Sequence, residues 1–170
     1  MRHSKILAAE AAAREARKGF LKELPVPLEK VARKYGIKVE TTYLDDDLSG
    51  MAFKKGDLSV IVVNGNHHPH RRRFTLAHEI GHHLLHSGYL KSNVHVDKAV
   101  LNRDSKSAKG SDYKEIEANA FAAELLMPER ELKSLARLDI NNDLAVQKAA
   151  KRLKVSVSAL TYRLANLDLR

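Results

Sequence analysis

Two histidines four residues apart, with a glutamate directly after the first, are the residues of this chain that point most directly to chemistry. His78, Glu79 and His82 form this H-E-x-x-H pattern within the segment HEIGHH. A spacing of four places both imidazoles on one face of a helix, one turn apart, where they can bind a single zinc ion. Glu79 lies only about 100° further around the helix, so its carboxylate can reach a zinc-bound water without taking a ligand position. The pattern predicts a hydrolytic metal site.

The residues around this pattern predict a helix with one buried side. Pro69 is expected to start the helix, and Ser87-Gly88 is expected to end it. Gly81 costs about 1 kcal/mol relative to alanine in a helix interior, and we interpret it as a place where another backbone comes close. The apolar residues recur at helical spacing; they are Leu76, Ala77, Ile80, Leu84 and Leu85.

A third metal ligand is expected from a second helix, within Ser111–Arg130, which Met127-Pro128 ends. Glu117 is the acid nearest the apolar face of this helix, and a carboxylate there is unfavourable unless it is paired or metal-bound. Glu117 is therefore the predicted third ligand, with Glu115 as second choice and Glu124 expected to be solvated. Two histidines and a glutamate with an open fourth position form a catalytic arrangement, whereas a closed shell of four is structural.

Other arrangements of the histidines fit less well. A metzincin site needs a third histidine ten residues after the first, where this chain has Gly88. His86 lies four residues after His82, but a helical row drifts by about 40° every four residues, so three histidines in one row would strain to share an ion. His83 and His86 are therefore expected to support the ligands or to be exposed. The alternative role for Glu117 is that of a salt-bridged helix acid.

Two segments together resemble a known family. The segment RFTLAHEIGHHLLH, followed by EIEANAFAAELLMP, is similar to the ImmA/IrrE family of zinc metallopeptidases, and the similarity covers roughly residues 25 to 165. The resemblance implies an intracellular, gluzincin-like peptidase in which His78, His82 and Glu117 bind zinc and Glu79 is catalytic. It also implies that the substrates are helix-turn-helix repressors, whose cleavage derepresses genes.

The composition fits one small cytoplasmic enzyme. At 170 residues the chain is long enough for one domain, alone or with a small appendage. The absence of cysteine excludes disulfides and cysteine zinc sites and fits a reducing cytosol. The sequence shows neither an apolar run of about 18 residues nor a signal peptide, so we expect no membrane partner. The net charge of +9 allows nucleic-acid contact without requiring it.

The predicted fold class is α+β, with a mostly helical zincin-like core, a small three-stranded sheet and a C-terminal helix-turn-helix-like subdomain. The peptidase domain is placed at residues 1–138, with an opening helix over 4–24, and the subdomain is placed at residues 139–170. By similarity to zinc peptidases, one edge of the sheet is expected to receive a substrate segment as an added strand. The strands are expected at residues 37–43, 51–53 and 58–63.

The last third of the chain predicts two short helices, residues 144–153 and 157–165, with Ser156 as the N-cap of the second. Its basic side chains allow DNA contact, but two short helices also need a partner surface for their apolar residues. We therefore favour a packing subdomain with a solvated basic face over a DNA-binding module. The basic residues are Lys148, Lys151, Arg152, Lys154 and Arg163.

Site-specific peptide hydrolysis is the function that these features predict. Zinc bound by two histidines and a glutamate would acidify its water, and Glu79 would take the proton and pass it to the leaving amine. Manganese or iron can occupy the same kind of ligand set. The alternatives are a catalytically silent zinc-containing regulator that binds a repressor or DNA, and a metal-dependent hydrolase of another kind, such as a nuclease.

Overall fold

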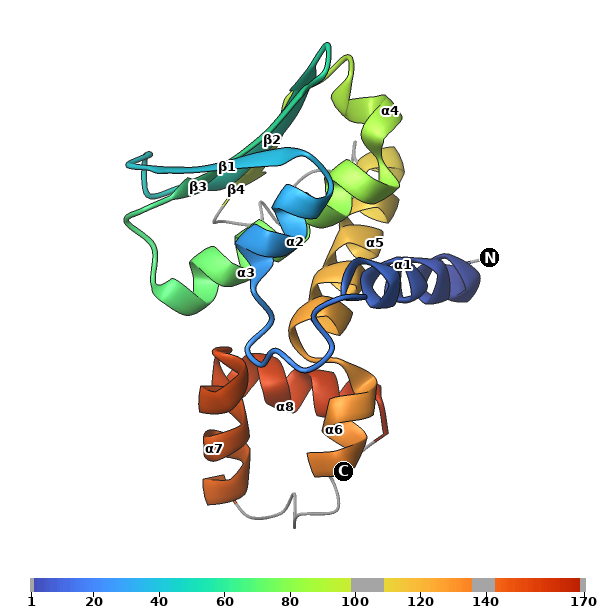
Figure 1. Cartoon of the computed structure of the whole chain (residues 1–170), viewed down its shortest axis with the longest axis vertical. Helices are drawn as coiled ribbons and strands as arrows, with labels where there is room; N and C mark the ends of the chain where they lie inside the picture. Colours follow the sequence, from blue (N-terminus) through green and yellow to red (C-terminus); the bar gives the residue numbers. More distant parts are fainter. Residues whose placement is uncertain (1, 99–108, 136–142, 169–170) are drawn as a thin grey trace.

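The computed structural model describes residues 2–98, 109–135 and 143–168. A sheet lies over a layer of helices, and the last three helices gather at the far end (Figure 1). The predicted α+β class is confirmed. Within the described ranges, no helix combines the length and the apolar character needed to cross a bilayer.

The helices are α1 (Arg2–Ala16), α2 (Leu28–Lys34), α3 (Pro69–Leu85), α4 (Ser87–Leu90), α5 (Lys109–Leu126), α6 (Glu129–Leu135), α7 (Asp143–Leu153) and α8 (Val157–Asn166), and the strands are β1 (Ile37–Thr42), β2 (Leu48–Lys55), β3 (Leu58–Asn64) and β4 (His95–Lys98).

The sheet has the strand order β1-β3-β2-β4. β1 lies parallel to β3, whereas β2 pairs antiparallel with both β3 and β4. The predicted hairpin of β2 and β3 is confirmed, and Gly56 in its turn has a φ of +59°, which favours glycine. The sequence predicts three strands, but the sheet has four, because the four residues of β4 are too few for an alternating pattern to stand out. β4 forms one margin of the described sheet.

The helix α3 packs between the sheet and α5. It begins at Pro69, as predicted, and the ring of His68 accepts a hydrogen bond from the backbone N–H of His70 at 3.2 Å. All nine residues from Thr75 to His83 are buried. Because several of them are polar, their side chains need hydrogen-bonding or ionic partners inside the protein.

The opening helix is shorter than predicted. α1 ends at Ala16, although the sequence predicts a helix to residue 24. The buried face of α1 is a stripe of alanines, which packs against α5. Beyond this stripe the chain turns at Gly19, where φ is +97°. The helix-favouring composition is thus overridden by the need to turn back toward α2. The buried alanines are Ala9, Ala13 and Ala16.

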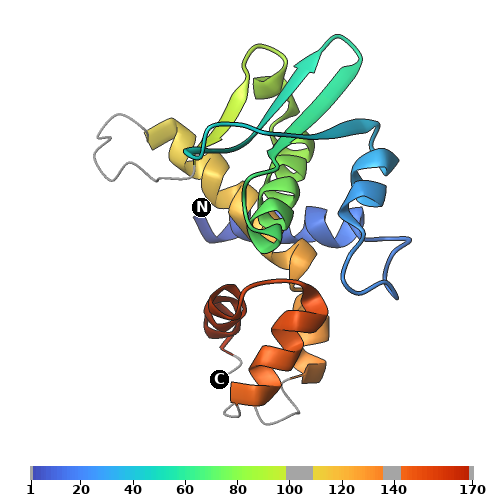
Figure 2. The ribbon, with the colours of Figure 1, turned by 90° about the vertical axis from the view of Figure 1, so that its left-hand side faces the viewer.

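Helices α6 to α8 form a group below α1 and α5 (Figure 2). Ser156 caps α8 as predicted, since its hydroxyl accepts a hydrogen bond from the backbone N–H of Ala159 at 3.1 Å. Arg163 of α8 is buried and pairs with Glu10 of α1 at 2.8 Å and with Glu124 of α5. The expectation that Glu124 is solvated is wrong, because it is 3% exposed. Arg163 therefore attaches α8 to the rest of the chain and takes no part in an exposed basic face.

Candidate metal centre

The two histidines of the H-E-x-x-H pattern lie side by side on α3. His78 and His82 are 3% and 0% exposed, and their Nε2 atoms are 3.0 Å apart. Both nitrogens thus face the same point beside the helix, where one ion can contact both of them.

Gly81 marks the contact between α3 and α5. A Cβ atom at this position would lie 3.1 Å from the Cδ1 atom of Phe121 and 3.3 Å from the Cα atom of Ala118. The predicted close approach of another backbone is confirmed. This contact brings the first half of α5 beside the imidazoles of α3. Glu115 lies three residues before Ala118, which places it on the same side of α5.

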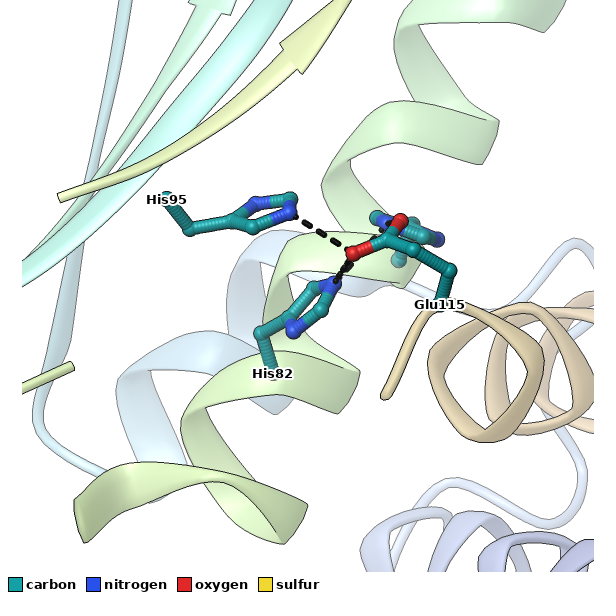
Figure 3. Close-up of side chains that lie close together, drawn as sticks. His82, His95 and Glu115 are labelled. Carbon is teal, nitrogen blue, oxygen red and sulfur yellow. Dashed lines mark hydrogen bonds and ion pairs between the residues drawn. The ribbon is translucent and has the colours of Figure 1, made fainter. Parts of the chain in front are cut away.

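Four side chains bring potential metal ligands together, and they come from three separate elements. Figure 3 shows His82 of α3 and His95 of β4 directed toward the carboxylate of Glu115 on α5. The Glu115 Oε2 atom is 3.2 Å from His78 Nε2. Its Oε1 atom is 3.3 Å from His82 Nε2 and 3.0 Å from His95 Nε2. Together the four residues offer donor atoms that all lie within 4.8 Å of one another.

The donor set fits a divalent transition metal. In a tetrahedral zinc site with bonds of about 2.0–2.1 Å, neighbouring ligand atoms are about 3.4 Å apart. The separations among the donors of His78, His82 and Glu115 are 3.0, 3.2 and 3.3 Å. The ring of His95 instead stacks on His82, with centroids 3.8 Å apart and planes 28° apart. Its Nε2 atom nevertheless lies 3.0 Å from Glu115 Oε1, so His95 remains beside the donor set.

Glu117, which the sequence predicts as the third ligand, lies outside this cluster. Its Oε2 atom is 2.8 Å from His86 Nε2, and its Oε1 atom is 3.4 Å from Lys5 Nζ. Two residues correspond to about 200° around a helix, so Glu115 and Glu117 point to different sides of α5. The carboxylate that the structure brings to the histidines is that of Glu115, the second choice from the sequence.

Glu79 is fully buried beside the cluster and contacts His95. The Nδ1 atom of His95 lies 3.0 Å and 3.2 Å from the two oxygens of the Glu79 carboxylate. Burial raises the pKa of Glu79, although His95 acts in the opposite direction. Burial would lower the pKa of His95, but its hydrogen bonds to Glu115 and Glu79 raise it to about 10. His95 thus bridges the carboxylate of the cluster and the carboxylate beside it.

The protonation states of the cluster follow from burial and from the contacts with Glu115. Burial lowers the pKa of His82 to about 4, despite its contact with Glu115. Burial would raise the pKa of Glu115, but its contacts with His78, His82 and His95 hold it far below its usual range. At neutral pH His82 is therefore neutral and Glu115 is ionised, which are the forms that bind metals.

A second set of hydrogen bonds holds the far side of each imidazole. The Nδ1 atom of His78 donates to Asn119 Oδ1 at 2.9 Å, which leaves Nε2 as the nitrogen that faces the carboxylate of Glu115. The Nδ1 atom of His82 is 3.1 Å from His86 Nδ1. His83 instead contacts the backbone oxygen of Val60 at 3.1 Å and joins α3 to the sheet. His86 thus supports His82, as expected, whereas the expectation for His83 is wrong, because this residue is buried and contacts the sheet.

Two residues of this site were missed in the sequence. His95 belongs to the segment VHVD, which carries no recognisable motif and whose place beside α3 depends on the pairing of β4 with β2. Asn119 carries a local signal, because it lies four residues after Glu115 and one after the buried Ala118. Glu115 and Asn119 are polar residues four apart on the face of α5 that meets α3, and this pattern favours Glu115 as a metal ligand.

Comparison with known proteins places these features in a family. The family model for the IrrE N-terminal-like domain, Peptidase_M78, matches residues 32–165. Over 107 residues the chain is 36% identical to the radiation response metalloprotease IrrE of Deinococcus radiodurans. That alignment covers 62% of this chain and 30% of the relative.

A solved structure, that of a transcriptional regulator from Mycobacterium tuberculosis, has a similar fold. The two superpose with a TM-score of 0.59 and a sequence identity of 25%, over 96% of this chain and 47% of the other. The present chain therefore spans less than half the length of each of these relatives.

Proposed function

The chain belongs to the IrrE N-terminal-like domain family of metallopeptidases, and from this premise we propose that it is a zinc-dependent endopeptidase that cleaves a specific protein in the cytoplasm. The proposed metal ligands are His78, His82 and Glu115, and Glu79 is the proposed general base. The observation that carries the proposal is the convergence of two imidazoles and one carboxylate from separate helices, beside a fully buried glutamate. Manganese and iron are the alternative metals for this donor set.

The mechanism assigns a proton path to the chain's own residues. Zinc bound at this site supplies Lewis acidity, which acidifies water and polarises a carbonyl group. Glu79 accepts the proton of the attacking water on its carboxylate and delivers it to the nitrogen of the leaving amine. Its raised pKa suits this role, since a base works best when its pKa approaches the working pH. The contact of His95 Nδ1, at 3.0 Å, fixes the orientation of the Glu79 carboxylate.

The margin of the sheet formed by β4 is the proposed substrate-binding edge. β4 carries His95, and among the described strands it pairs with β2 alone. An extended segment of the substrate can therefore add to its other side through backbone hydrogen bonds. The half-exposed Val94 and Val96 offer apolar contacts to such a segment. The choice of a helix-turn-helix repressor as substrate rests on the resemblance of the sequence motifs to the ImmA/IrrE family.

The test is cleavage of a purified helix-turn-helix repressor from the same genome by the zinc-loaded protein. We expect a single cut that a chelator abolishes and added zinc restores. Glu79→Gln should keep one equivalent of zinc but stop cleavage, because an amide cannot accept the proton. Glu115→Gln should lose both zinc and activity. Normal turnover by Glu79→Gln would remove this residue from the base role, and cleavage that survives complete zinc removal would overturn the proposal.

A catalytically silent, zinc-containing regulator is the second candidate. Two observations favour it: the similar solved structure is that of a transcriptional regulator, and α7 carries the exposed residues Lys148, Lys151 and Arg152. A zinc-loaded protein that shifts the mobility of operator DNA, or binds the repressor, without cutting any candidate protein would select this function.

A further inference from the structure

His82 stands at the inner end of a line of three side chains that leads away from the cluster. Its Nδ1 atom is 3.1 Å from His86 Nδ1, and the opposite nitrogen of His86, Nε2, is 2.8 Å from Glu117 Oε2. His82 belongs to α3, His86 is the residue at the C-terminal cap of that helix, and Glu117 belongs to α5. His86 is 9% exposed, so water does not compete freely for these contacts.

The carboxylate of Glu117, at the outer end of this line, sets which atom donates in each hydrogen bond. An ionised carboxylate only accepts hydrogen bonds, so Glu117 requires a proton on His86 Nε2. A neutral His86 then has a lone pair on Nδ1, which requires a proton on His82 Nδ1. A neutral His82 has one ring proton, and because the contact of its Nδ1 atom with His86, at 3.1 Å, is shorter than that of Nε2 with Glu115, at 3.3 Å, we place the proton on Nδ1 and the lone pair on Nε2. That atom is the one that lies 3.0 Å from His78 Nε2 and 3.3 Å from Glu115.

We propose that His86 and Glu117 are positioning residues which hold His82 in the tautomer and orientation that bind the metal. The inference rests on the proposed function, because it assigns His82 as a ligand. A carboxylate behind a ligating histidine increases the basicity of the ring and fixes its rotation. Here the carboxylate acts through a second imidazole instead of contacting the ligand directly. Glu117, which the sequence predicts as a metal ligand, thus supports the metal site through His86 and His82.

The structure contains matched partners for a test. Lys5 of α1 contacts the other oxygen of Glu117 at 3.4 Å and is half exposed, so its removal perturbs Glu117 without breaking the line to His82. Glutamine at position 117 retains an oxygen that can accept from His86 Nε2, whereas alanine does not. The variants are therefore Glu117→Ala, Glu117→Gln, His86→Phe and Lys5→Ala, each compared with the wild-type chain.

The first measurement is zinc affinity, determined by competition with a chromogenic chelator. Glu117→Ala and His86→Phe should each bind zinc about 10- to 100-fold more weakly. Glu117→Gln should recover much of this loss, and Lys5→Ala should bind zinc as tightly as the wild type. Equal affinity of Glu117→Ala and wild type, or an equal loss in Lys5→Ala and Glu117→Ala, would overturn the proposal. If His86→Phe does not fold, the two Glu117 variants carry the comparison, because Glu117 lies nearer the surface.

The second measurement is the tautomer of His82 in the zinc-free protein, read from its two ring-nitrogen chemical shifts by NMR. The wild type should carry its proton on Nδ1, and Glu117→Ala should shift the balance toward a proton on Nε2. A wild-type ring protonated on Nε2 would refute the line of hydrogen bonds. The two measurements separate the hypotheses: a wild-type chain that binds no zinc defeats the proposed function, whereas the tautomer is tested without metal.

Discussion

Replacing Gly81 by alanine tests whether the approach of α5 to α3 assembles the site. Alanine is favoured over glycine in a helix interior by about 1 kcal/mol. The new Cβ atom would meet Phe121 at 3.1 Å and the Ala118 backbone at 3.3 Å, so one of the helices must move by a few tenths of an ångström. Overpacking of this kind costs about 1–3 kcal/mol. The net expectation is a destabilisation of between about 0 and 2 kcal/mol.

Gly88 provides the matched control. It also lies in a helix, α4, but a Cβ atom there would meet nothing within 4 Å. Gly88→Ala should gain the helix-propensity term alone, so the difference between the two variants isolates the overpacking cost of about 1–3 kcal/mol.

Thermal unfolding and zinc competition are the assays for this pair. A difference of 1 kcal/mol corresponds to a shift in Tm of about 2–4 °C for a chain of this size. Gly81→Ala should unfold at a lower temperature than Gly88→Ala and should bind zinc more weakly, because the displaced α5 carries Glu115. Equal Tm values and equal zinc affinities for the two variants would refute the argument that this helix contact sets the metal site.

Three further predictions concern stability. Arg163→Met leaves the buried Glu124 carboxylate without its closest partner, so urea unfolding should show a loss of about 3–5 kcal/mol; a loss below 1 kcal/mol would contradict the role of this ion pair. The zinc-free protein should lose free energy of unfolding as the pH falls from about 6.5 toward 4, because the pKa of His82 is lowered to about 4 and the unfolded chain binds that proton more readily. It should also lose stability as the pH rises from about 6.5 toward 10, because the pKa of His95 is raised to about 10 and the folded state binds the proton more tightly; His95→Gln should abolish this alkaline decline in urea titrations. Asn64→Ala should cost about 1–3 kcal/mol in the same titrations, because the fully buried amide bonds to the backbone of the loop between β1 and β2 and of Leu48, the first residue of β2. An unchanged unfolding midpoint would show that water replaces these bonds.

The features that the sequence predicts well are those controlled by neighbours along the chain. The start of α3 at Pro69, the hairpin of β2 and β3 and the cap at Ser156 each depend on a few adjacent residues. The close contact at Gly81 was also visible, since a glycine in a helix interior needs a packing reason. The opening helix was overestimated because its end depends on the path of the chain toward α2.

The choice between Glu115 and Glu117 could not be made from hydrophobic periodicity. α5 packs against α3 on one side and against α1 on another. Since two of its faces are buried, a carboxylate next to apolar residues can belong to either contact. Glu115 faces α3, whereas Glu117 lies at the side where Lys5 of α1 reaches it.

By itself, the sequence determined that a helix presents two histidines and a glutamate at metal-binding spacing, because that geometry is contained within two turns of one helix. Only the tertiary structure decided which carboxylate completes the set and that His95 stands beside it. Those assignments depend on the rotation of α5 about its axis and on the pairing of β4 with β2. Both arise from packing between segments that are distant in the chain, which no local pattern encodes.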